Sequence, residues 1–236
     1  MKDKKSGSGA SLLREAFRAT LPVMAGYLVL GAGFGMVLKS KGFGIPWAGA
    51  MSLFIYAGSM QFVAADLMAS GASLLTLAVT TLLVNARHLF YGISMVDRYR
   101  NAGKAKPYLI FALTDETYSL LCARQNGPAG SGEIRYDLTV SLLNQSYWVA
   151  GSLAGALLGE FLPFNTEGID FALTALFITV VVDQWRGGKH RLCTVMGLSV
   201  SLVCLLVFGP DNFLIPAMAM ILASVFLIRK REAAYE

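Results

Sequence analysis

Charged side chains are scarce in this sequence. They make up 15% of its 236 residues, whereas an ordinary globular domain is about 25% charged. Six stretches contain none: residues 20–38, 42–65, 67–86, 138–159, 192–208 and 213–228. About 20 helical residues cross the hydrocarbon core of a bilayer, and most of these stretches approach or exceed that length. The distribution excludes an ordinary soluble domain and predicts an integral membrane protein.

Histidine, cysteine and the common catalytic motifs are also few or missing. Two histidines exclude a histidine-rich metal site, and the three cysteines lack metal-ligand spacing and are interpreted as small buried residues. The sequence contains no G-x-x-x-x-G-K-[ST] loop, no G-x-S-x-G elbow and no H-E-x-x-H pair. We therefore expect no metal, nucleotide or other cofactor, and an enzymatic role is disfavoured.

The basic residues outnumber the acidic ones, 20 to 15, but they lie in short clusters between the apolar stretches. This is the pattern of cytoplasmic loops in membrane proteins, and we expect no binding to nucleic acid. The basic segments are the N-terminal tail and residues 98–106, 186–191 and 229–231. We expect these to be cytoplasmic, and residues 160–170, which lack Lys and Arg, to be external.

Two apolar segments, residues 46–68 and 107–123, must be partial or re-entrant for these assignments to agree. The predicted fold is an all-α, polytopic transmembrane bundle of about five full spans with broken or re-entrant helices and both termini cytoplasmic. Lys39 and Lys41 oppose this scheme, since it places them outside. The expected domains are a cytoplasmic tail with an amphipathic helix (1–19), a transmembrane domain (20–228) and a cytoplasmic tail (229–236).

The first candidate site lies in residues 56–62, YAGSMQF, in the middle of an apolar run. Gly58 allows the chain to leave helical geometry, and Ser59 and Gln61 add polar groups at that depth. The N-terminus of a half-helix suits a carboxylate, because its N–H groups have no partner within the helix. The alternative is a continuous helix in which Gly58 serves only close packing.

The second candidate lies in residues 85–92, NARHLFYG, within an expected helix over residues 73–91. Helical spacing predicts that Asn85 and His88 share one face and that Arg87 and Tyr91 share another. His88 titrates near neutral pH and is a candidate proton carrier. The alternative is that Arg87 and His88 lie near a membrane surface and extend to water.

The third candidate is the acidic pair Asp115 and Glu116, within an expected helix over residues 107–123. One helical stripe places Asp115 among aromatic residues: Tyr108, Phe111, Asp115, Tyr118 and Cys122. A carboxylate there can pair with Arg87 or with an amino group. The alternative is a surface helix with solvated acids.

Small residues mark a close helix contact further along the chain. Gly151, Gly155 and Gly159 form a doubled G-x-x-x-G, and Asn144 and Trp148 lie one turn apart on the same predicted helix. Glycines at this spacing favour close approach of another helix, either within the chain or on a partner.

These motifs, in this order, resemble the AzlC/YgaZ family, the large subunits of bacterial branched-chain amino-acid exporters. The matching residues are LP at 21–22 with Gly31 to Gly35, YAGSMQF at 56–62, RHLFYG at 87–92 and LTDE at 113–116. The resemblance implies export of L-valine or related apolar amino acids across the bacterial plasma membrane. It also implies a small membrane partner of the AzlD/YgaH type and no ATP-binding subunit.

We place the expected substrate site where the break at Gly58 meets the second and third candidates. Substrate-binding residues are predicted to be Gly58, Ser59, Gln61, Asn85, Asp115 and Glu116. Arg87, His88 and Asp115 are predicted to couple charge or protons, with Arg87 neutralising Asp115 in the empty site. The open alternatives are a passive small-solute channel or membrane scaffold and, less favoured, an intramembrane enzyme that uses His88.

Overall fold

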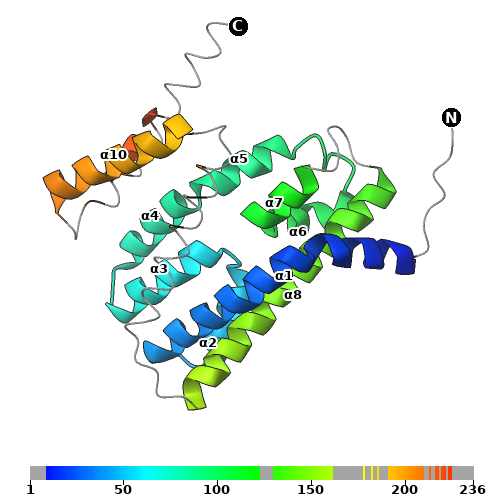
Figure 1. Cartoon of the computed structure of the whole chain (residues 1–236), viewed down its shortest axis with the longest axis horizontal. Coiled ribbons are helices and arrows are strands. Elements are labelled where there is room, and N and C mark those ends of the chain that lie inside the picture. Colours follow the sequence, from blue (N-terminus) through cyan, green and yellow to red (C-terminus); the bar gives the residue numbers. More distant parts are fainter. Residues whose placement is uncertain are drawn as a thin grey trace, which may run out of the picture. The chain divides into compact units, whose positions relative to one another are not determined.

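The computed structural model describes residues 9–122, 130–161 and 191–209, with a few further residues between 178 and 224. The chain divides into two units, Met1–Ala72 with Asn85–Thr166 and Ser73–Val84 with Glu167–Glu236. Every regular element in the described ranges is a helix, and these ranges contain no strand (Figure 1). The all-helical fold class is therefore confirmed.

Helix α1, Gly9–Ser40, runs for 32 residues. The expected amphipathic helix and the first span are thus one helix, and Pro22 lies inside it. The ribbon changes direction after its N-terminal part (Figure 1), as a proline that removes a helical hydrogen bond would cause. Within the described residues α1 is the one single helix long and apolar enough to cross a membrane.

Two further helices together satisfy the same test of length and hydropathy. They are α4, Leu74–Val84, and α5, Ala86–Ser94, which are separated only by Asn85. The prediction of one continuous helix over residues 73–91 is therefore wrong, because Asn85 interrupts it with a φ of −92° and a ψ of 5°. Asn85 and His88 consequently do not share the face of one helix.

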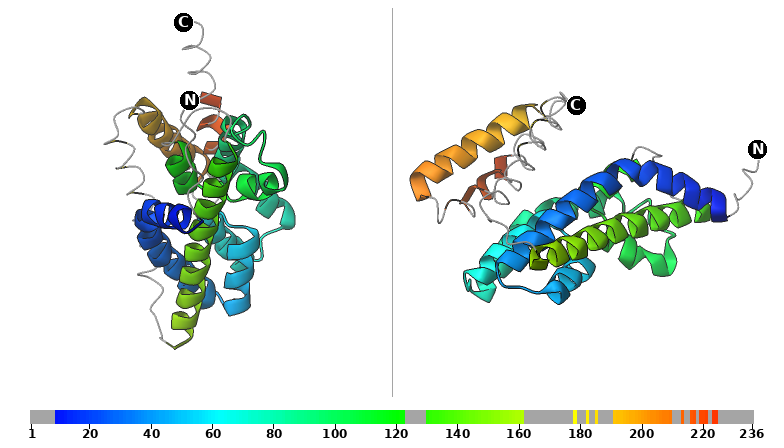
Figure 2. Two further views of the ribbon diagram at one scale, coloured as in Figure 1. Left: turned by 90° about the vertical axis from the view of Figure 1, so that its right-hand side faces the viewer. Right: turned by 60° about the horizontal axis from the view of Figure 1, so that its bottom comes forward.

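Helix α8, Ser131–Phe161, contains the helix predicted over residues 138–159 and lies alongside α1 (Figures 1 and 2). Glycines make this close approach possible. A Cβ atom on Gly35 would meet the backbone of Ser152 and Ala156, and one on Gly155 would meet the backbone of Ala32. The G-x-x-x-G face therefore serves a contact within the chain, which decides between the two uses that its sequence allowed.

The apolar run at residues 46–68 is broken, as predicted. Helix α2, Ile45–Phe54, ends before the interruption, and α3, Gly58–Ala69, begins after it. Tyr56 between them has a φ of 43°, in the left-handed region that L-residues seldom adopt.

The acidic segment is broken as well. Helix α6, Lys106–Phe111, follows the 3₁₀ turn Gly103–Ala105, and α7, Asp115–Cys122, begins after a gap of residues 112–114. Thr114 caps α7, since its Oγ1 accepts the backbone N–H of Thr117 at 3.3 Å. The predicted helix over residues 107–123 and its continuous aromatic stripe are therefore wrong.

The charges near the end of α8 bear on the predicted orientation. Lys39 lies 3.7 Å from Glu160, and Lys41 pairs with Asp66. Lys39 and Glu160 thus lie at the same end of the α1–α8 pair, as the predicted scheme requires, and both lysines are paired with an acid. The orientation of this end in the membrane stays a prediction.

Helix α10, Arg191–Phe208, confirms the helix expected over residues 192–208. Gly209 follows it with a φ of 74°, a conformation suited to glycine at a helix end. Several sequence predictions lie wholly or largely outside the described residues. They are the run at 171–182, the basic clusters at 186–191 and 229–231, most of the segment 160–170, most of the run at 213–228 and the N-terminal tail up to residue 8.

The α1–α8 contact predicts a strong contrast between two glycines of α1. Gly35→Leu should destabilise the fold by about 3 kcal/mol or more, because the side chain has no space between the two backbones. Gly33→Leu is the control, since a Cβ atom at this position would have no other atom within 4 Å. The stability of each variant is measured by thermal unfolding in detergent, with size-exclusion chromatography as the readout of the folded fraction. Equal stability of the two variants would contradict this packing.

Candidate functional site

The interruptions place three candidate side chains at the first turns of three helices. Ser59 is the second residue of α3, Arg87 is the second of α5 and Asp115 is the first of α7. Arg87 Nη1 lies 2.7 Å from Asp115 Oδ2, and Arg87 Nη2 donates to Ser59 Oγ at 2.9 Å. Segments far apart in the sequence therefore meet at one guanidinium group, which we call the Arg87 junction.

The Arg87 junction is accessible. The side chains of Arg87 and Asp115 are 42% and 37% exposed, although the Oδ1 atom of Asp115 is itself buried and has no hydrogen-bond partner within the described residues. An ion pair exposed to this extent contributes little net free energy, on the order of 0–1 kcal/mol. A polar or charged solute can therefore compete for either partner at low cost.

His88 and Asn85 flank the junction without joining it. The His88 ring lies 5.9 Å from the Tyr91 ring, and its side chain makes no hydrogen bond within the described part of the chain. Asn85 lies at the break before α5, and its buried Oδ1 atom likewise has no partner among the described residues. Both lie within two residues of Arg87 in the sequence, so a solute at the junction lies near them.

Gln61 belongs to a separate, buried network. Its side chain is fully buried, accepts a hydrogen bond from Trp148 Nε1 at 2.8 Å and donates to Ser52 Oγ at 3.4 Å. Gly58 packs against the same indole, which a Cβ atom would approach to 3.0 Å. The broken-helix interpretation of Gly58 is therefore confirmed and the continuous helix of the alternative is wrong, although Gly58 also makes room for Trp148.

Glu116 points into another network, which joins α1, α7 and α8. Tyr27 donates its hydroxyl to Glu116 Oε2 at 2.6 Å and lies 2.7 Å from Thr114 Oγ1. Thr114 donates to Thr117, and Asn144 Nδ2 donates to Thr117 Oγ1 at 2.9 Å. Sequence reasoning noted Asn144 as one turn from Trp148 but did not find this network, because hydroxyls of Thr and Tyr carry no distinctive spacing.

Aromatic rings lie one turn further along the two helices that meet at the junction. Tyr91 follows Arg87 by four residues on α5, and Tyr118 follows Asp115 by three on α7. Their rings stack with centroids 4.5 Å apart, and Ser94 donates to the Tyr118 hydroxyl at 3.1 Å. Tyr118 thus lies beside the ionic groups as predicted, although it belongs to the short helix α7 rather than to one helix over residues 107–123.

One of the basic residues in the segment 98–106 is buried. Arg98 is 5% exposed and makes two hydrogen bonds to Asp137 of α8, from Nε to Oδ2 at 2.7 Å and from Nη2 to Oδ1 at 2.9 Å. The hydrogen bonds to Asp137 raise the pKa of Arg98 above its ordinary value, so the guanidinium stays charged despite burial. Sequence analysis missed this pair because it counted Arg98 as a solvated loop charge.

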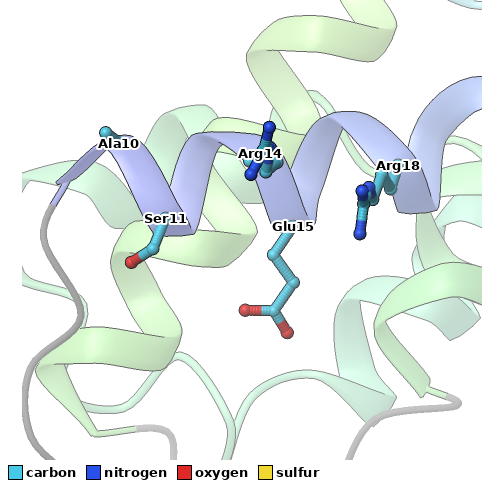
Figure 3. A pocket seen from close by; sticks show the side chains of 5 residues that line it. All are labelled: Ala10, Ser11, Arg14, Glu15 and Arg18. Atoms are coloured by element: carbon cyan, nitrogen blue, oxygen red, sulfur yellow. The ribbon is translucent and has the colours of Figure 1, made fainter.

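A surface hollow on the N-terminal part of α1 lies apart from these groups. Its lining side chains all come from this one helix: Ala10, Ser11, Arg14, Glu15 and Arg18 (Figure 3). All five are exposed, so the hollow has no enclosing wall and does not define a solute site.

The family model described as AzlC protein matches residues 22–162. A relative from Bacillus subtilis (strain 168), named branched-chain amino acid transport protein AzlC, is 44% identical over 92% of this chain and 85% of its own length. The chain belongs to the AzlC family. Two other relatives are an uncharacterized membrane protein of Helicobacter pylori (strain J99), 41% identical over 92% of this chain and 95% of its own, and the inner membrane protein YgaZ of Escherichia coli (strain K12), 28% identical over 85% and 84%. No solved structure matches.

Membership of the AzlC family confirms the resemblance and agrees with the membrane character of the sequence. The matched residues 22–162 include Ser59, Arg87 and Asp115 and the networks around Gln61 and Glu116. The Arg87 junction and its supporting networks are therefore built from the part of the chain that defines the AzlC family.

The buried network predicts a specific role for Trp148. Trp148→Phe should cost about 1–3 kcal/mol, because it leaves the buried Gln61 oxygen without its donor. Trp47→Phe is the control, since Trp47 is 52% exposed and should tolerate the change. Denaturation midpoints of the two purified variants compare them. If both midpoints match that of the unmodified protein, the hydrogen bond does not support the site.

Proposed function

We propose that this protein is a secondary transporter that exports branched-chain or related apolar amino acids, of the L-valine type, across the bacterial plasma membrane. It acts as the large subunit of a two-component exporter with a small membrane partner, and it needs no ATPase. The observation that carries the proposal is the Arg87 junction, where groups of opposite charge meet at the first turns of three short helices. The name of the Bacillus relative supports the substrate class.

An amino-acid zwitterion fits the charges of the junction. Its carboxylate can bind Arg87 and the N-terminal end of α3 at Gly58 and Ser59, where backbone N–H groups have no partner within the helix. Its ammonium can bind the carboxylate of Asp115, which is 37% exposed and whose buried Oδ1 atom has no hydrogen-bond donor within the described residues. Each charge then finds an opposite partner, which a charge leaving water requires.

The empty site is neutral because Arg87 and Asp115 pair with each other. A zwitterion replaces this one ion pair by two, Arg87 with the carboxylate and Asp115 with the ammonium. Net charge is unchanged by binding, and neither side chain is left unpaired at any stage. Glu116 remains the second acid for the ammonium, although its bond to Tyr27 must first loosen.

The stacked rings of Tyr91 and Tyr118 offer an apolar wall one turn from the ionic groups. A wall of this kind separates side chains that differ by one methylene by only about 1–3 kcal/mol. Valine, leucine and isoleucine should therefore compete for the same site.

Asp115→Asn is the central test. It keeps the shape of the side chain but removes the charge that binds the ammonium, so radiolabelled valine flux should fall at least about 100-fold. The assay uses vesicles with the small partner subunit present and an imposed pH gradient. Asp97→Asn is the control, because Asp97 is an exposed acid outside the site. Undiminished flux in Asp115→Asn protein that accumulates normally would exclude Asp115 from substrate binding, and flux that needs no gradient would indicate a channel.

His88 is proposed as the proton carrier, since its ordinary pKa is about 6.5 and it adjoins Arg87. Valine flux by the unmodified protein should depend on pH, and His88→Gln should flatten that profile. His190→Gln controls for the other histidine of the sequence. A pH profile that His88→Gln leaves intact would remove His88 from proton coupling.

A further inference from the structure

A series of contacts follows Arg87 along the chain. Along α5 and the turn after it, Arg87 pairs with Asp115, Tyr91 stacks on Tyr118, and Ser94 bonds the Tyr118 hydroxyl. Arg98 then binds Asp137 of α8 with two hydrogen bonds. Each successive contact lies further from the junction, in the direction of the segment 98–106.

The Arg98–Asp137 contact is flanked along the chain by residues of a buried apolar cluster. Met95 and Tyr99, which flank Arg98, and Tyr136 and Val140, which flank Asp137, belong to one buried cluster. The cluster also takes in side chains of α1, α6 and α7, so five segments meet around the ion pair. Its remaining buried members are Ala16, Ala102, Leu109, Leu113, Leu121 and Ile134. Arg98 is 5% exposed and Asp137 is fully buried, so water does not reach this pair.

We propose that this cluster is the closed gate through which the amino acid must enter from the side of residues 98–106, and that Arg98–Asp137 is its latch. This gate rests on the proposed transport function, because only a solute pathway needs one. The positive charges of residues 98–106 indicate that this side is cytoplasmic, the side from which an exporter loads.

A buried ion pair suits a latch that must open repeatedly. The attraction between the two ions in a dry environment roughly offsets the cost of removing both from water. The ion pair therefore fixes the geometry of the closed state but adds little net free energy to it. When the gate opens to water, both ions recover their hydration. Removing one partner deprives the other buried charge of its two hydrogen bonds, which favours the hydrated, open arrangement.

Cysteine accessibility tests the gate without any amino acid present. The reporter is Ser59→Cys in a protein whose three native cysteines are replaced by serine. A membrane-impermeant maleimide is applied to vesicles of each orientation. Lys104→Cys, at an exposed position after the latch, identifies the vesicles that present this end. The reporter should react slowly from that side in the protein with Arg98 and Asp137 intact.

Asp137→Asn and Arg98→Gln should each speed that reaction at least about tenfold, because each removes the opposite charge that binds a buried ion and so favours opening. Glu160→Gln is the matched control, since it removes the ion pair with Lys39 at the other end of the same helix and should leave the rate unchanged. If both variants accumulate too poorly to assay, Arg98→Lys keeps the charge but loses the two-bond geometry, and a smaller increase is expected.

An unchanged reporter rate in the latch variants that do accumulate, Arg98→Lys included, would overturn the gate, as would an equal increase in Glu160→Gln. The two proposals fail separately. Latch variants that speed labelling in a protein with no flux of valine or related amino acids would retain the gate and contradict the proposed substrate. Gradient-driven valine flux together with unchanged labelling in the latch variants would support the proposed substrate and contradict the gate.

Discussion

The contact between α1 and α8 is the constraint on which the rest of the first unit depends. The two backbones approach so closely at Gly35 and Gly155 that neither position has space for a Cβ atom. This contact fixes the position of α8, the helix that carries Asp137, Asn144 and Trp148. The partners of these three side chains lie in three other segments, so a displaced α8 would disconnect the latch, the Glu116 network and the Gln61 network together.

A second constraint comes from the bilayer itself. A helix that breaks within a membrane exposes backbone N–H and C=O groups, which lipid cannot bind. Breaks are therefore tolerated where protein or a polar cavity surrounds them. Of the breaks described here, those before α3 and α7 adjoin polar side chains held in place by α8, and Asn85 adjoins Arg87. The breaks also place Ser59, Arg87 and Asp115 at helix ends, where they meet and can bind a zwitterion, which links the architecture of the first unit to the proposed transport.

The ion pairs made by α5 and by the turn after it show how burial assigns similar chemistry to two tasks. Arg87–Asp115 is roughly 40% exposed and is open to competition by a solute, whereas Arg98–Asp137 is dry and held by two hydrogen bonds. The first can exchange partners with little change in free energy. The second cannot lose one partner without leaving an uncompensated charge, so it opens only together with its surroundings. One short segment thus connects the proposed substrate site to the proposed gate.

The sequence by itself determined the membrane character, the helical fold class, the family and the break at residues 55–57, because each depends on local composition and spacing. It also identified Ser59, Arg87 and Asp115 as candidates that could meet. Only the tertiary structure showed that the helices break again at Asn85 and at residues 112–114. The second break involves a hydrogen bond between Thr114 and Tyr27 of α1, which lies 87 positions away. The burial of Gln61 and Arg98 was equally inaccessible from the sequence. A glutamine or arginine is ordinarily solvated, and its partner lay 87 or 39 positions away on α8. Pairing over such distances is decided by packing of whole helices rather than by any local pattern.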